Sequence, residues 1–89
     1  MEENLREKIA SLREQYRLKE AEREIKKALE QEADNSVLLI EYGKLYVLQG
    51  WYNNAIETFN RVIGNDPSNE DAFKEKISAL RSQYYFDDA

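Results

Sequence analysis

Few side chains of this 89-residue chain have the types and spacing that catalysis or metal binding requires. Adjacent carboxylates occur as Glu2-Glu3 and Asp87-Asp88, but exposed termini hold no fixed geometry, so we expect neither pair to bind a metal. The sequence has no cysteine and no histidine, the residue that most often activates a serine nucleophile. No catalytic role is therefore expected of the serines, which are Ser11, Ser36, Ser68, Ser78 and Ser82. We predict a protein that is not an enzyme and holds no cofactor or metal.

The composition favours helices in a soluble chain. Hydrophobic residues make up 42% of the sequence and charged residues 35%, with one proline and three glycines to interrupt a helix. No segment approaches the roughly 20 consecutive apolar residues of a membrane span, and the charged N-terminal segment does not resemble a secretory signal. We expect no membrane association. A cytoplasmic location is the one we expect, because the lack of cysteine is compatible with it.

The charge distribution argues against nucleic-acid binding. The net charge is −5, which repels a phosphate backbone unless the basic residues are segregated into a patch. Lysine and arginine are instead interleaved with glutamate along the chain. We therefore expect a protein or peptide as the partner, and no nucleic acid.

An internal repeat organises the chain. A shift of 34 residues carries Leu5 onto Leu39, and a second shift carries Leu39 onto Phe73. The first and third segments match most closely, since residues 2–21 and 70–89 share most of their charged and apolar positions. A period of this size is typical of a solenoid, in which each unit buries its apolar face on the next unit.

The apolar spacing predicts two helices in each complete unit. The helices are expected near residues 3–15, 19–31, 36–49, 52–64 and 70–84. Asn35-Ser36 supplies an N-cap for the third helix, and the segment 66–69 ends the fourth helix and begins the fifth. Ser68 followed by Asp71 resembles a capping box, with Asp in place of the usual Glu or Gln.

The middle unit carries a signature of residues at fixed spacing, formed by Leu39, Tyr42, Gly43, Tyr46, Ala55, Phe59 and Pro67. This signature resembles that of the tetratricopeptide repeat. Gly43 would let the paired helix approach closely, with Ala55 serving the same contact from the other side. A coiled coil is the alternative, but Gly50 and Pro67 interrupt any long rod.

The resemblance implies an all-α fold, a superhelix of antiparallel helix pairs with five helices. It implies a single domain over residues 1–89, divided into units 2–35 and 36–69 and an incomplete unit 70–89. The incomplete unit would leave Phe73, Ile77 and Leu80 partly uncovered. Weak self-association through that C-terminal edge is therefore one possible property of the chain.

In the family that this chain resembles, the first helix of each unit lines a concave groove that binds the partner. Val37, Ile40 and Val47 form an apolar stripe there, with Lys44 between them. The candidate groove residues are Arg6, Ala10, Arg13, Val37, Ile40, Lys44, Val47, Lys74, Ser78 and Arg81. The alternative is that the apolar stripe is simply core between adjacent helices. A neighbouring row, formed by Glu7, Glu41 and Glu75, would nearly cancel the basic charge if it faces the groove.

These features predict a non-catalytic module that binds a peptide or a segment of a partner protein, within a scaffold or adaptor. A docking or regulatory segment of a larger enzyme is one alternative, and self-association through the C-terminal edge is another. A clamp for a C-terminal carboxylate is not expected, because the corresponding groove positions include Glu41, Asp71 and Glu75. Trp51 is either an exposed aromatic anchor or a cover over Gly50.

Overall fold

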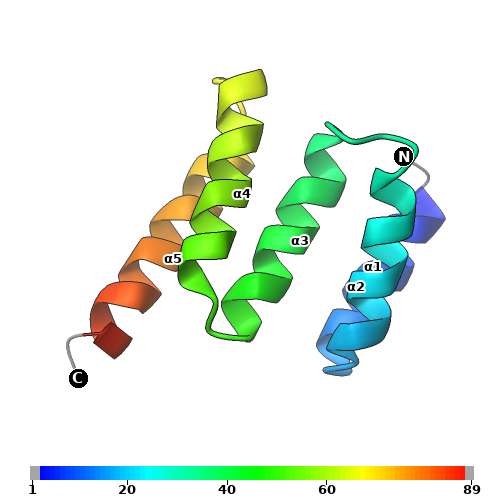
Figure 1. Cartoon of the computed structure of the whole chain (residues 1–89), viewed down its shortest axis with the longest axis horizontal. Helices are drawn as coiled ribbons and strands as arrows, with labels where there is room; N and C mark the ends of the chain where they lie inside the picture. The colour runs from blue at the N-terminus through cyan, green and yellow to red at the C-terminus, as the bar shows by residue number, and fades with distance from the viewer. Residues whose placement is uncertain (1–2, 88–89) are drawn as a thin grey trace.

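The computed structural model describes residues 3–87, with side chains described for residues 4–85. The terminal pairs Glu2-Glu3 and Asp87-Asp88 therefore lie outside the described side chains. Five helices form this part of the chain (Figure 1). They are α1 (Glu3–Glu14), α2 (Leu18–Leu29), α3 (Ser36–Leu48), α4 (Tyr52–Asn65) and α5 (Glu70–Asp87). The predicted all-α fold with five helices is confirmed, although α5 continues beyond its expected end at residue 84.

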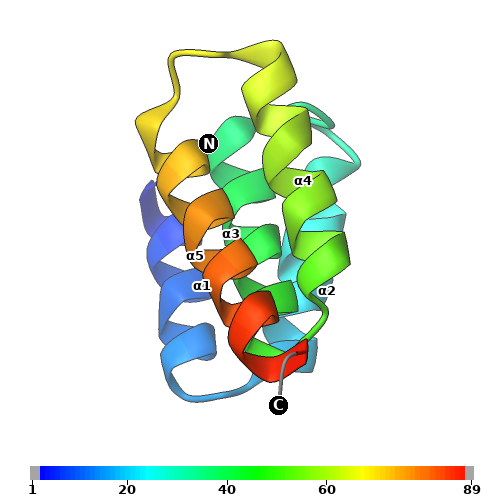
Figure 2. The same ribbon diagram turned by 90° about the vertical axis from the view of Figure 1, so that its left-hand side faces the viewer.

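The helices form antiparallel pairs that stack side by side. In the view of Figure 2, α1, α3 and α5 lie toward one side of the molecule, and α2 and α4 lie toward the other. Each even-numbered helix packs against the odd-numbered helices before and after it, and α3 also contacts α1 and α5. This arrangement is the expected superhelix of helix pairs.

Two asparagines, one repeat period apart, begin the first helices of the second and third units. The Asn35 side chain accepts a hydrogen bond from the Leu38 amide at 3.1 Å, and Asn69 accepts one from Ala72 at 3.0 Å. Each bond satisfies one of the amides that the first helical turn leaves without a partner. The expected capping role of Ser68 is wrong, because its hydroxyl instead donates to Asp66 at 2.7 Å.

The turns inside the two complete units share one geometry. Tyr16 and Gly50, also one period apart, take positive φ angles of 60° and 79°. The amide that follows each of them reaches back to a helix carbonyl, from Arg17 to Leu12 at 2.8 Å and from Trp51 to Tyr46 at 2.9 Å. This is the Schellman ending of a helix, in which glycine is the usual left-handed residue. Tyr16 adopts it without being glycine, so the sequence did not indicate this turn.

The buried side chains form two clusters that meet on α3. The N-terminal cluster consists of Ile9, Leu12, Ala21, Ile25, Leu38 and Leu45. The C-terminal cluster consists of Leu39, Ile40, Ala55, Phe59, Val62, Ala72 and Ala79. Helix α3 contributes residues to both clusters, because its neighbours cover it on opposite sides. Its sequence is accordingly apolar around most of its circumference.

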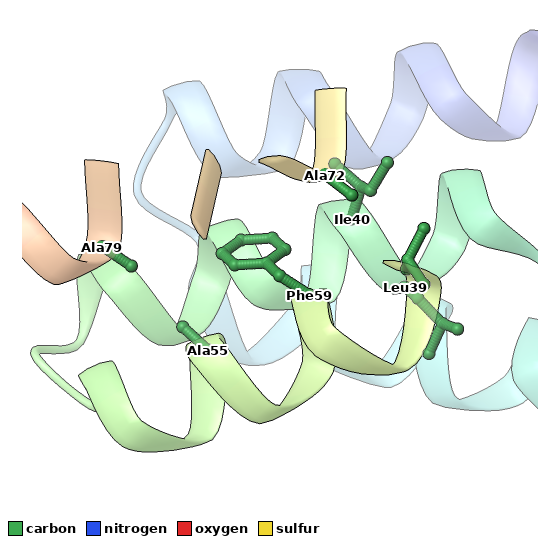
Figure 3. Close-up of a cluster of buried hydrophobic side chains, with 7 residues drawn as sticks. Leu39, Ile40, Ala55, Phe59, Ala72 and Ala79 are labelled. Carbon is green, nitrogen blue, oxygen red and sulfur yellow. The ribbon is translucent and has the colours of Figure 1, made fainter. Parts of the chain in front are cut away.

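A close contact between α3 and α4 centres on Gly43. A Cβ atom added there would lie 2.3 Å from Cε1 of Phe59, so no residue with a side chain fits without displacing the ring. The sequence predicted Ala55 as the partner of Gly43, whereas the nearest atoms belong to Phe59, one helical turn later. Figure 3 shows the Phe59 ring beside Ala55 and near Ala72 and Ala79 of α5. Gly43 thus makes room for the ring that joins α3 to α5.

Replacement of Gly43 by alanine is expected to lower the free energy of unfolding by about 1–3 kcal/mol, because the Phe59 ring must move. Gly64 provides a matched control on α4, since a Cβ added there meets no atom within 4 Å. Gly64→Ala is expected to raise the free energy of unfolding by about 0.5–1 kcal/mol, by reducing the flexibility of the unfolded chain. Urea unfolding of both variants measures the difference, and equal stabilities would contradict the assigned contact.

Candidate functional site

Two adjoining hollows lie along the side formed by α1, α3 and α5, and we call them together the groove. The first hollow is lined by Arg6, Val37, Ile40, Glu41, Lys44, Asp71, Lys74 and Glu75. The second is lined by Arg13, Lys44, Val47, Leu48, Glu75 and Ser78. Most of the predicted groove residues therefore meet on one surface. Ala10 and Arg81 line neither hollow; Ala10 is half-buried and Arg81 is exposed.

The size of the hollows limits what can occupy them. Their volumes are about 250 Å³ and about 200 Å³. Sites for small molecules usually enclose about 300–1,000 Å³. Each hollow is therefore suited to one or two side chains of a larger ligand, and Lys44 and Glu75 line both hollows.

An ion cluster around the buried carboxylate of Glu41 lines the groove. The Glu41 side chain is 5% exposed, accepts a hydrogen bond from Nη1 of Arg13, and lies 3.7 Å from Nζ of Lys44. A carboxylate this far from water requires such partners, because burial of an unpaired charge is costly. Arg13 and Lys44 were predicted as groove residues, and here they neutralise Glu41. The three glutamates of the predicted acidic row also differ in exposure to solvent. Glu7 is exposed, Glu41 is buried and Glu75 is half-buried.

The apolar stripe divides between core and surface. Ile40 is 8% exposed and belongs to the C-terminal cluster, so the alternative interpretation as core describes it correctly. Val37 and Val47 are half-buried and each lines one of the hollows. Two apolar positions of the stripe thus remain accessible, one in each hollow.

A separate aromatic row lies on the other side of α3 and was not predicted as a surface feature. The rings of Tyr42 and Tyr46 stack at 4.7 Å, and Trp51 stacks on Tyr46 at 6.3 Å. Burial raises the pKa of Tyr42, and a hydrogen bond with Tyr46 adds to this effect. Trp51 is 57% exposed, which agrees with the interpretation as an exposed aromatic. Tyr42 and Tyr46, but not Trp51, also line a third hollow, together with Leu29, Leu39, Glu57, Thr58 and Arg61.

The family model of the tetratricopeptide repeat matches residues 12–80 of the chain. This chain belongs to the tetratricopeptide repeat family. The match spans α2, α3 and α4 completely, which agrees with the repeat seen in the caps and turns. No curated protein matches the chain.

Tetratricopeptide repeats act in general as non-catalytic modules of protein–protein interaction. Membership in the family therefore supports a protein partner for this chain. Within residues 3–87, no helix combines the length and apolar character needed to cross a membrane. Where on the tetratricopeptide surface a partner binds has to be argued from the groove itself.

Removal of Arg13 is expected to leave Glu41 buried with Lys44 as its one remaining partner. Arg13→Ala should therefore lower the free energy of unfolding by about 3 kcal/mol. The matched control is Arg17→Ala, which breaks an exposed pair with Glu20 and should cost less than about 1 kcal/mol. Chemical denaturation of the two variants tests this, and similar losses would mean that the ion cluster does not stabilise the fold.

Proposed function

We propose that the groove binds an extended or helical segment of a partner protein, as part of a scaffold or adaptor. The segment places one apolar side chain in each hollow, against Val37 and Val47. The observation that carries this proposal is the pair of small adjoining hollows, each with a half-buried valine and charged residues at its rim. Their size supports side chains of a peptide rather than a whole small molecule as the ligand.

The charged residues of the groove favour a partner segment that carries acidic side chains. Arg13 and Lys44 are committed to Glu41, so they contribute little to the binding of a ligand. Arg6 and Lys74 are exposed, and neither has an ion-pair partner among the described side chains. Both line the first hollow, where they are positioned to bind carboxylates on either side of the apolar side chain.

A free C-terminal carboxylate is a poor ligand for this groove. Asp71 and Glu75 line the first hollow, and a terminal carboxylate placed there would meet their negative charge. Internal segments, whose acidic side chains can reach Arg6 and Lys74 at the rim, avoid this repulsion. The proposal therefore concerns internal segments of the partner.

The experiment is a selection of random 12-residue peptides against the whole chain, followed by affinity measurements on the selected peptides. Enriched sequences are expected to carry one or two apolar residues next to Asp or Glu. Lys74→Glu and Arg6→Glu should each weaken binding by roughly three- to tenfold, and the loss should shrink at high salt.

Lys27→Glu, on the exposed surface of α2, is the control for the change in net charge and should leave the affinity unchanged. All four proteins are first compared by thermal melting, so that a loss of folding is not mistaken for a loss of binding. Selected peptides that bind the Arg6 and Lys74 variants as tightly as the original chain would refute the proposed groove.

A further inference from the structure

The third hollow lies on the side of α3 away from the groove. Its lining residues come from α2, α3 and α4, and Figure 2 shows α2 and α4 together on one side of the molecule. The volume is about 370 Å³, larger than that of either hollow of the groove. It falls within the usual range of about 300–1,000 Å³ for sites that enclose a small ligand. The third hollow therefore has room for one large side chain.

Two residues of this hollow depart from the signature of the tetratricopeptide repeat. In that signature a tryptophan stands at the position of Leu39, and a leucine stands at the position of Tyr42. Leucine is smaller than tryptophan, so Leu39 leaves more room, while Tyr42 adds an aromatic ring where the signature has an aliphatic side chain. Both residues line the third hollow. In this form the hollow is therefore a property of this chain rather than of the signature.

The aromatic row reaches into the third hollow. Tyr46 stacks on both of its neighbours in the row, with interplanar angles of 21° to Tyr42 and 13° to Trp51, so these two rings are the ends of the row. Of the two ends, Tyr42 lines the hollow. The face of an aromatic ring carries partial negative charge and attracts cations. A planar cation stacked on Tyr42 would extend the row by one layer.

The rim formed by α4 has one carboxylate without a cationic partner. Nη2 of Arg61 lies 3.0 Å from Oδ1 of Asp34, so this guanidinium is already paired. Glu57 is exposed and has no ion pair among the described side chains. An acidic ligand would have to displace Asp34 from Arg61, whereas a basic ligand finds Glu57 available.

The charges on α2 do not alter this balance. The pKa of Lys26 is raised by its hydrogen bond to Glu22 and by the charge of that carboxylate, with Nζ and Oε1 2.9 Å apart. The same glutamate lies close enough to Tyr42 to contribute to the rise of the tyrosine pKa, after burial and Tyr46. The charged residues at the hollow thus comprise three acids and two bases, with a net charge of −1: Glu22, Asp34, Glu57, Lys26 and Arg61.

We propose that the third hollow binds an arginine side chain of a partner polypeptide, with its guanidinium stacked on Tyr42 and paired with Glu57. The guanidinium is planar and weakly hydrated, so it stacks on aromatic rings, and its N–H groups bind a carboxylate through two parallel hydrogen bonds. The methylene groups of the arginine would lie along the apolar part of the hollow, which Leu29 and Leu39 form.

Other occupants fit the hollow less well. The ammonium of lysine is a strongly hydrated point charge that does not stack as a plane. An acidic side chain would meet the unpaired carboxylate of Glu57. A polypeptide is the expected source of the arginine, because the tetratricopeptide repeat family acts in protein–protein interaction. The third hollow is separate from the groove, so the inference does not depend on the proposed function.

The test compares three peptides of one glycine- and serine-rich sequence, with arginine, citrulline or lysine at the centre. Citrulline keeps the planar shape of arginine without its charge. Amide chemical shifts of the isotope-labelled whole chain are followed up to about 10 mM peptide. The arginine peptide is expected to cause saturable shifts at Tyr42, Tyr46 and Thr58. The citrulline peptide should bind roughly three- to tenfold more weakly and the lysine peptide at least about twofold more weakly.

Two variants test the assigned contacts. Tyr42→Leu restores the leucine of the signature, so it should remain folded, and it should weaken binding of the arginine peptide roughly two- to fivefold. Glu57→Gln should reduce the preference for arginine over citrulline by a similar factor. Glu14→Gln, on the exposed surface of α1, is the control for the loss of an acid and should leave the affinity unchanged. Lys74→Glu, in the groove, should also leave it unchanged, which separates this site from the proposed function.

Three outcomes would overturn the inference. One is the absence of saturable shifts up to about 10 mM arginine peptide. Another is equal affinity for the arginine and citrulline peptides, which would mean that the charge of the ligand is not recognised. The third is binding of the arginine peptide that shifts Asp71 and Glu75 and that neither Tyr42→Leu nor Glu57→Gln alters, which would assign the arginine to the groove.

Discussion

The close approach of α3 and α4 at Gly43 is the constraint from which the rest of the packing follows. Because Gly43 has no side chain, the ring of Phe59 occupies the space that a Cβ atom would take. The ring lies in the same cluster as Ala72 and Ala79, so it also sets where α5 packs. Helix α5 in turn supplies one wall of the groove. A single missing side chain thus affects the spacing of three helices, α3, α4 and α5.

The fold was predictable from the sequence because its signals repeat. The helix starts at Asn35 and Asn69 are local features that recur at the period of the apolar pattern, and Gly43 is a local feature of the middle unit. The turn at Tyr16 carried no such signal, because its left-handed residue is tyrosine rather than glycine. The turn depends on the hydrogen bond that the Arg17 amide donates to the Leu12 carbonyl. The end of α5 was likewise misplaced, because no breaker marks it in the sequence.

The groove was predicted more accurately in position than in chemistry. Helical spacing was enough to bring Arg6, Val37 and Lys74 to one surface. Spacing does not reveal which charges are buried, because the burial of Glu41 depends on Arg13, which is distant in sequence and reaches it from another helix. Two of the predicted groove residues, Arg13 and Lys44, therefore pair with Glu41 within the fold. Depth below the surface is a tertiary property, and a repeat pattern alone leaves it undetermined.

The position of α3 in both core clusters has a consequence for how the molecule unfolds. Leu38 and Leu45 belong to the cluster of the first unit, while Leu39 and Ile40 belong to the cluster of the second. Unfolding of α3 would expose both clusters to water at once, so the two units are energetically coupled through this helix. The array should lose its structure as one cooperative transition, with α1 the helix whose detachment disturbs its neighbours least.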